Sequence, residues 1–234
     1  MYQRRPICLT IAGFDPSGGA GIVADLRTFE AMGCFGEAVI TTQTVQNSKG
    51  VKSTVAVDEN IVRDQLFTLA KDLPVRAIKI GMVGNEKIIR VIVDFLKTGF
   101  CKGIPVVLDP IVMSSSGHEM LPETARKVMM TELLPHVTLV TPNIPEAEHL
   151  RLNAENCPTA LLIKGGHGDF TDRLFINNGC HEFYAQRVNT TNTHGTGCVL
   201  SSAITAALAK GRSLKDAVGE AKNFLVKELN ENKL

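Results

Sequence analysis

Residues 7–33 read ICLTIAGFDPSGGAGIVADLRTFEAMG and contain the structural unit that decides the fold. The apolar run at 7–13 predicts a buried strand, and the apolar spacing at 20–32 predicts a helix that ends at Gly33. The glycine-rich turn 15–21 joins the two. A strand that passes through a short turn into a helix begins a βαβ unit, which predicts an α/β protein.

The same alternation continues along the rest of the chain. Strands are predicted at 38–45, 77–80, 105–108, 137–140 and 160–164, and helices at 60–71, 86–97, 122–133, 198–210 and 214–229. A hairpin of strands 174–176 and 182–184 is expected around Asn177-Asn178-Gly179, because these residues favour tight turns. We therefore predict a mainly parallel sheet with helices on both faces, in a single domain over residues 1–234.

Composition narrows the possible functions. The 234 residues carry a net charge of +1, and 44% of them are hydrophobic. No basic or acidic block occurs, which argues against a nucleic-acid or membrane partner. The apolar runs are far shorter than the roughly 20 residues of a transmembrane helix, and no signal peptide is recognisable, so a cytoplasmic location is expected. Six cysteines without a Cys-x-x-Cys pair predict reduced thiols rather than a zinc site.

A second glycine-rich segment, Thr193-His194-Gly195-Thr196-Gly197-Cys198, directly precedes the apolar helix pattern 199–208. Small residues at a helix N-terminus expose backbone N–H groups, and the helix dipole adds positive potential. Gly195, Thr196 and Gly197 are therefore candidates for an anion hole that binds a phosphate or a phosphoryl group in transfer. An ordinary glycine-rich helix start is the alternative. A Walker A loop is excluded because the chain has no Gly-Lys dipeptide.

Cys198 opens the same helix. A thiol at this position is expected to have a lowered pKa, because the helix N-terminus favours the thiolate. It could then accept the proton of a substrate hydroxyl as a general base. A covalent nucleophile and a buried, inert thiol are the alternatives.

Polar residues follow several predicted strands, at the edge where parallel sheets usually bind ligands. Asp109 could organise a metal or phosphate, and Lys164 could place positive charge on phosphate or simply be a solvated strand-end lysine. Asn143 and Glu146 could share a helical face and hold Mg²⁺ through water, although helix capping by Asn143 is the alternative. Asp25 lies in the first predicted helix, where a solvated helix charge is the favoured interpretation from the pattern alone.

These segments, in this order, resemble the hydroxymethylpyrimidine/phosphomethylpyrimidine kinases, a branch of the ribokinase-like superfamily. The resemblance runs from Leu9 to about Leu229. The blocks that carry it are 9–13, 15–21, 24–29, 39–41, 46–47, 50–51, 79–82, 109–110, 141–147, 164–167 and 191–198.

The resemblance implies a bifunctional kinase of thiamin biosynthesis that uses MgATP and commonly forms a homodimer. It would phosphorylate the hydroxymethyl group of 4-amino-5-hydroxymethyl-2-methylpyrimidine and then the resulting monophosphate. The implied pyrimidine site comprises Gly13, Ala20, Asp25, Gln46, Met82 and Ile111. The implied catalytic group comprises Gly195, Thr196, Gly197 and Cys198 as base. The implied ATP site comprises Asp109, Asn143, Glu146, Lys164 and Thr196, with Mg²⁺ held through water by Asp109 and Glu146.

Two segments depart from the family pattern. After Asp109-Pro110 the family usually has Val-Met-Val-Ala-Lys-Ser-Gly-Asp, whereas residues 111–118 read IVMSSSGH. Ser115 and His118 replace the lysine and the aspartate, which weakens a phosphate role for this loop. The segment 149–158 is shorter than usual and lacks room for an extra helix, so the adenine-side wall is expected to differ.

Two other functions remain open from the sequence. A pyridoxal/pyridoxine kinase uses the same scaffold, although Gln46 favours a pyrimidine because its amide offers both a donor and an acceptor. A ligand-binding relative without catalysis is suggested by the shortened segments, and the presence of Cys198, Asp109 and Glu146 argues against it.

Overall fold

The protein is described from a computed structural model, which covers residues 5–47, 49–72, 74–114, 117–165, 171–184 and 194–231. These residues form one sheet of nine strands. In spatial order the strands are β3 (Gly50–Ala56), β2 (Phe35–Asn47), β1 (Ile7–Phe14), β4 (Val75–Ile80), β5 (Val106–Leu108), β6 (Leu139–Val140), β7 (Ala160–Ile163), β8 (Thr171–Ile176) and β9 (Gly179–Tyr184). The neighbours from β2 to β7 run parallel, while β3, β8 and β9 pair antiparallel. The prediction of a mainly parallel sheet is confirmed.

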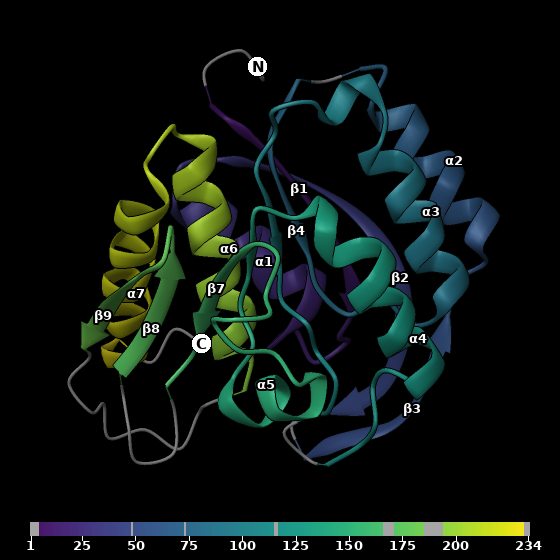
Figure 1. The fold of residues 1–234 in the computed structure, drawn as a ribbon. Helices are drawn as coiled ribbons and strands as arrows, with labels where there is room; N and C mark the ends of the chain where they lie inside the picture. The colour runs from purple at the N-terminus through teal and green to yellow at the C-terminus, as the bar shows by residue number, and fades with distance from the viewer. Residues whose placement is uncertain are drawn as a thin grey trace.

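Helices cover both faces of the sheet (Figure 1). One face carries α1 (Gly21–Ala31), α6 (Thr196–Ala209) and α7 (Leu214–Asn230), and the other carries α2 (Glu59–Leu69), α3 (Glu86–Leu96) and α4 (Glu123–Val128). The short helix α5 (Ile144–Leu150) follows β6. Helix α6 is apolar around most of its circumference because it lies between the sheet, α1 and α7. This position explains why a helix that starts at the predicted anion hole has almost no solvated face.

The predicted hairpin has the turn that its sequence favours. Asn177 and Asn178 adopt φ values of 49° and 60°, and the turn joins β8 directly to β9. Left-handed conformations at both central residues match the right-handed twist of the flanking strands, and asparagine tolerates them better than most residues. The hairpin prediction is therefore confirmed.

Two elements differ from the prediction. Strand β3 was not predicted: it lies at the sheet edge, where most of its residues are exposed, so neither an apolar run nor a clear alternation marks it. The helix expected at 122–133 is regular only to Val128, and the chain continues as a π-helical turn over Met129–Leu133. Edge strands gain their hydrogen bonds from a neighbour, which the local sequence does not reveal.

The shortened segment after α5 is a compact turn. Asn153 Oδ1 accepts hydrogen bonds from the backbone N–H groups of Glu155 and Asn156. Asn156 Nδ2 donates to the Arg151 carbonyl oxygen at 2.7 Å. The expectation that no extra helix fits between 149 and 158 is confirmed.

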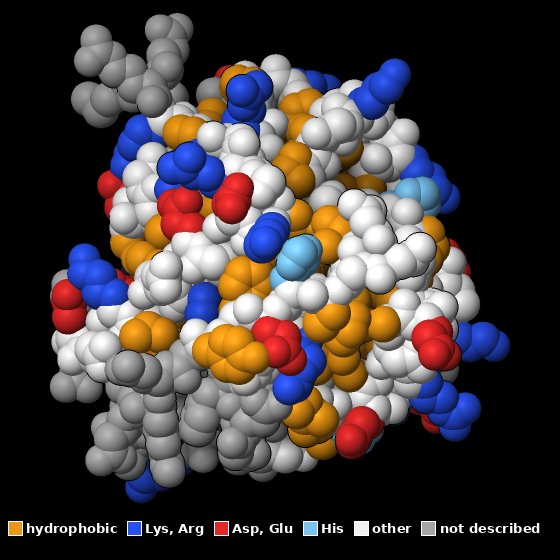
Figure 2. All heavy atoms as spheres, turned by 60° about the vertical axis from the view of Figure 1, so that its left-hand side comes forward, with side chains coloured by type: hydrophobic (Ala, Val, Ile, Leu, Met, Phe, Trp, Pro, Cys, Tyr) orange, Lys and Arg blue, Asp and Glu red, His pale blue; other side chains and the backbone are white. Residues whose placement is uncertain are grey.

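Charge is mixed over the visible surface. Figure 2 shows Lys and Arg side chains interspersed with Asp and Glu on the face that it presents. None of the helices in the described part of the chain is both long and apolar enough to cross a membrane. All six cysteines are free thiols, as predicted.

Candidate active site

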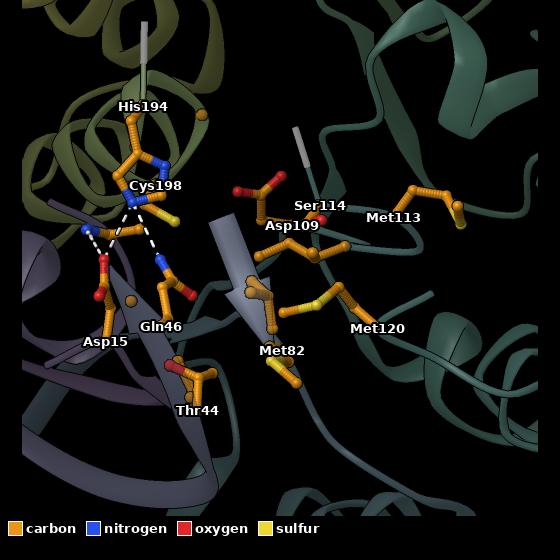
Figure 3. A pocket seen from close by; sticks show the side chains of 18 of the residues that line it. Asp15, Thr44, Gln46, Met82, Asp109, Met113, Ser114, Met120, His194 and Cys198 are labelled. Atoms are coloured by element: carbon orange, nitrogen blue, oxygen red, sulfur yellow. Dashed lines mark hydrogen bonds and ion pairs between the residues drawn. The ribbon is translucent and has the colours of Figure 1, made fainter. Parts of the chain in front are cut away.

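A cavity of about 340 Å³ lies at the carboxyl ends of the parallel strands. Most predicted site residues line it, namely Gly13, Ala20, Gln46, Met82, Asp109, Ile111, Asn143, Glu146, Lys164, Gly195, Gly197 and Cys198. Thr196 stands among them as the first residue of α6. The edge expected to bind ligands therefore brings these distant segments together (Figure 3). Ser115, Gly166, His167, Thr191 and Thr193 lie outside the described residues.

Asp109, Lys164 and Glu146 form a charged end of this cavity. Lys164 Nζ donates to Asp109 Oδ1 at 2.7 Å and lies 3.9 Å from Glu146 Oε2. Burial by itself raises the pKa of Asp109, but the ammonium groups of Lys164 and Lys79 hold that pKa below its ordinary value. Burial and the negative charge of Asp109 raise the pKa of Glu146, and the Lys164 ammonium offsets this only in part. The Lys164 ammonium therefore interacts with two carboxylates, of which Asp109 has a lowered pKa and Glu146 a raised pKa.

Asn143 and Glu146 also start helix α5. Asn143 Oδ1 accepts from the Glu146 N–H, and the Asn143 N–H donates to Glu146 Oε2, both at 2.8 Å. This reciprocal pair is a capping box, so the capping alternative is correct as a description of local structure. The same box fixes the Glu146 carboxylate at the cavity wall, where it is 6% exposed. Capping and a place in the site are therefore compatible.

The start of helix α6 presents backbone to the cavity. Gly195 is the N-cap residue with φ 78°, and a Cβ there would lie 1.8 Å from the Gly19 carbonyl oxygen, so only glycine fits. A Cβ on Gly197 would lie 3.2 Å from Lys164 Nζ and 3.6 Å from Asp109 Oδ2. The positive end of the helix dipole therefore lies beside a lysine, at a place open to a ligand.

Cys198 lines the cavity, but its proton affinity is opposite to the prediction. Burial raises the pKa of its thiol to about 11, and the nearby Lys79 ammonium only partly offsets this. The expected lowered pKa is wrong because loss of water, together with the negative charges of Asp25 and Asp109, outweighs Lys79 and the hydrogen bond from the Gly21 backbone. The thiol is therefore protonated at neutral pH in the protein without ligand.

Asp25 and Lys79 form a closed ion pair at the wall of the cavity, which Lys79 lines. Both side chains are fully buried, and Lys79 Nζ donates to both carboxylate oxygens of Asp25 at 2.8 Å. Thr10 Oγ1 and Ser202 Oγ also donate to this carboxylate, at 2.6 and 2.8 Å. Burial by itself lowers the pKa of Lys79, but Asp25 raises it above its ordinary value, so Lys79 is charged. The contact of Asp25 with a pyrimidine stays a prediction, because its carboxylate faces Lys79 rather than the cavity.

The other end of the cavity carries hydrogen-bonding and apolar groups. A β-bulge between β2 and β3 lies at Val45 and Gln46, and Gln46 lines the cavity beyond it. Bulges commonly redirect side chains next to active sites. Figure 3 shows Gln46 beside His194 and Asp15, whereas Met82 and Met120 lie on the opposite wall.

The sequence assigned no role to three polar residues at the cavity, namely Asp15, Lys79 and His194. Lys79 stands within the apolar run 77–80, and a charge inside a buried strand signals a buried partner. Asp15 and His194 give a weaker signal, since each only adjoins a glycine-rich turn. Their meeting depends on contact between two distant loops, which no local pattern predicts.

The carboxylates of the cavity fit one kind of metal site. In the described ranges, no group of three or more His, Cys, Asp or Glu side chains could hold a metal ion. Asp109 and Glu146 are two hard oxygen ligands on one cavity wall. They fit Mg²⁺, which keeps much of its water shell and also binds phosphate oxygens, rather than a metal enclosed by protein ligands.

Comparison with known proteins gives a consistent set of similarities. A family model described as phosphomethylpyrimidine kinase matches residues 15–234. A hydroxymethylpyrimidine/phosphomethylpyrimidine kinase of Salmonella typhimurium is 40% identical, over 95% of this chain and 90% of that protein. The crystal structure of a phosphomethylpyrimidine kinase from Clostridium difficile has a TM-score of 0.81 at 37% identity and covers 96% of this chain and 100% of that chain. An ADP complex of Bacillus subtilis pyridoxal kinase has a TM-score of 0.87 at 30% identity, with 97% and 92% covered.

Proposed function

The chain belongs to the phosphomethylpyrimidine kinase family, and we propose that it transfers the γ-phosphoryl group of ATP to 4-amino-5-hydroxymethyl-2-methylpyrimidine and then to the resulting monophosphate. Both transfers would serve thiamin biosynthesis. The observation that carries the proposal is the division of one cavity. Gln46 offers an amide at one end, and Lys164 offers positive charge at the other, where Gly197 in the first turn of α6 lies beside it. Cys198 lines the same cavity.

Positioning and charge compensation would supply most of the catalysis, as in other phosphoryl transfers. The acceptor hydroxyl oxygen forms the new bond to the γ-phosphorus while the bond to the ADP oxygen breaks. The N–H groups at 195–198 and the Lys164 ammonium would stabilise the negative charge on the group in transfer. Mg²⁺, when bound, would neutralise phosphate charge, and Asp109 and Glu146 would hold it through water.

We assign the acceptor proton to Cys198. As the new bond forms, the hydroxyl loses its proton and the Cys198 thiolate takes it, which gives the neutral thiol. Burial raises the pKa of this thiol to about 11, so only the thiolate fraction can act and the rate should increase with pH. Lys79 is the nearby charge that favours the thiolate.

A kinase assay tests the proposal directly. Purified protein with MgATP should release ADP only when the hydroxymethylpyrimidine is present, and mass spectrometry should identify the mono- and diphosphate products. The Cys198→Ala variant, with its fold checked by circular dichroism, is the control. Absence of pyrimidine-dependent ADP release would overturn the proposal and favour a binding role without catalysis.

A pyridoxal kinase is the second candidate, favoured by the TM-score of 0.87 to the Bacillus subtilis pyridoxal kinase. The same assay with pyridoxal and the pyrimidine as competing acceptors separates the two. We expect a higher kcat/KM for the pyrimidine. Much faster turnover of pyridoxal would reverse the assignment.

Three further properties are part of the proposal. Residues 1–234 would act as one kinase domain, which the single sheet supports. The protein would act in the cytoplasm as a homodimer. Val45 and Val55, which are 52% and 61% exposed on the neighbouring strands β2 and β3, offer an apolar surface for such a contact.

A further inference from the structure

His194 connects the two loops at the amide end of the cavity. Its Nε2 atom lies 3.0 Å from Asp15 Oδ2 and 3.1 Å from Gln46 Nε2 (Figure 3). Asp15 is 3% exposed, and its carboxylate also accepts hydrogen bonds from the Ser17 N–H, the Ser17 hydroxyl and the Ala20 N–H. The histidine therefore meets a carboxylate that is already surrounded by donors.

Whether Asp15 is ionised decides whether the His194 imidazole donates or accepts the hydrogen bond between them. Burial by itself raises the pKa of Asp15, but the hydrogen bonds from Ser17 and His194 hold it below its ordinary value. An ionised carboxylate only accepts hydrogen bonds. The His194 Nε2 atom must therefore carry a hydrogen, which it donates to Asp15.

This hydrogen restricts the amide of Gln46. With its NH₂ group against His194, two N–H groups would face each other across 3.1 Å. The two ends of an amide have nearly the same shape and are assigned from their hydrogen bonds. Rotation of the amide by half a turn places Gln46 Oε1 beside this N–H, which then donates to both Asp15 Oδ2 and Gln46 Oε1 as one bifurcated hydrogen bond. The NH₂ group of Gln46 then points away from His194, toward the cavity.

We propose that His194 is a positioning residue that fixes the Gln46 amide with its NH₂ group toward the ligand. This inference rests on the proposed function and names the ring edge that the site selects. An NH₂ group that faces the cavity requires an acceptor, such as the ring nitrogen next to an exocyclic amino group. A 4-oxo pyrimidine presents a ring N–H at that position, so two donors would meet.

The surrounding loops hold His194 in one place. A Cβ on Gly19 would lie 2.6 Å from His194 Cδ2, so the imidazole packs directly on that glycine. Gly195, the next residue, packs even more closely, since a Cβ there would lie 1.8 Å from the Gly19 carbonyl oxygen. The histidine therefore connects the loop that follows β1 with the residues that begin α6. A pyrimidine ring bound by Gln46 would therefore be held in a fixed position relative to the backbone that would bind the phosphoryl group.

Two substitutions test the proposal. His194→Phe keeps a ring of similar size but removes the donor, and His194→Gln keeps an N–H that reaches Asp15 and Gln46. Both are assayed with the 4-amino substrate and its 4-oxo analogue, and KM for ATP is measured alongside. Isothermal titration with each pyrimidine adds a readout that does not depend on turnover.

In His194→Phe we expect KM for the 4-amino substrate to rise and the preference for it over the 4-oxo analogue to fall roughly tenfold. KM for ATP should stay within about twofold, and His194→Gln should recover most of the preference. Unchanged preference in His194→Phe, or equal losses for ATP and pyrimidine, would overturn the proposal, since the latter indicates a purely structural role.

Nitrogen-15 NMR of the imidazole separates this inference from the proposed function. A protonated Nε2 in the ligand-free protein supports it even if the substrate proves to be another azine. An unprotonated Nε2 contradicts it, whatever activity the protein has.

Discussion

Two aspartate–lysine pairs lie next to the cavity, and they differ in how completely they are closed. In the pair of Asp25 and Lys79 neither side chain is exposed, and the ammonium binds both carboxylate oxygens. In the pair of Asp109 and Lys164 the lysine keeps 11% exposure and lies beside the bare Cα of Gly197. The same chemistry therefore supports two roles. The closed pair joins α1 to β4 and supplies charge near Cys198, whereas the open pair is the one that we propose to interact with phosphate.

Removing the closed pair's cation should have the largest effect. Lys79→Met leaves the Asp25 carboxylate buried without its counter-charge, so we expect the free energy of unfolding to fall by about 3–5 kcal/mol. Urea denaturation measures the change. The double variant Asp25→Leu/Lys79→Met should recover part of the loss, because an apolar pair leaves no buried charge. A single variant as stable as the parent would contradict the closed-pair account.

Removing the cation of the open pair, Asp109 and Lys164, should affect activity more than stability. Lys164→Met should lower kcat by about 10²–10³-fold, because a preorganised positive charge on the transferred group is lost. Its midpoint of urea denaturation should change less than that of Lys79→Met, since Asp109 keeps the Thr141 hydroxyl as a partner and the Lys79 ammonium as a nearby charge. If Lys164→Met unfolds while Lys79→Met only slows the reaction, the two pairs have been assigned the wrong way round.

Charges from both pairs act on the Cys198 thiol, because Lys79 lowers its pKa while Asp25 and Asp109 raise it. The pH dependence of the reaction therefore sharpens the comparison. Burial raises the pKa of the thiol to about 11. The thiolate therefore grows as pH rises, and kcat should increase from neutral pH upward. Cys198→Ala should lower kcat about 100-fold and remove this increase. A flat pH profile in the parent enzyme would show that Cys198 does not take the proton.

Substitution of two neighbouring serines of α6 should have the smallest effects, and the two variants are closely matched to each other. Ser202 Oγ donates to Asp25 Oδ1 at 2.8 Å in the closed pair. Ser201 Oγ lies 2.9 Å from the Gly197 carbonyl oxygen but 3.3 Å from Asp109 Oδ2, so its one hydrogen is better placed for the backbone. Ser202→Ala should cost about 1.5–3 kcal/mol of unfolding free energy, and Ser201→Ala about 0.5–1.5 kcal/mol. Equal or reversed costs, measured in urea, would remove the distinction between the pairs.

The order of strands and helices could be predicted from the sequence where burial leaves a pattern. The strands at 7–13 and 77–80 are apolar because both faces of a parallel sheet are covered, and the turn at Asn177 and Asn178 has its own local signature. Strand β3 could not be found in this way, because its hydrogen bonds depend on β2 and most of its side chains are exposed.

The residues of the candidate site could likewise be predicted from the sequence only in part. Its place at the carboxyl ends of the strands follows from the fold class, so most of the residues expected there line one cavity, with Asp25 and Thr196 as the exceptions. The pKa of Cys198 could not be predicted, because the sequence reveals a helix start but not the burial and carboxylates that surround it. The roles of Asp15 and His194 likewise depend on a contact between loops 179 residues apart.

A crystal structure with the hydroxymethylpyrimidine and ADP bound tests the central claim most directly. The hydroxymethyl oxygen should lie within about 3.5 Å of Cys198 Sγ, with the ring edge against Gln46 and the ADP phosphates at the start of α6. A pyrimidine bound outside this cavity, or one whose hydroxymethyl group points away from Cys198, would contradict the account.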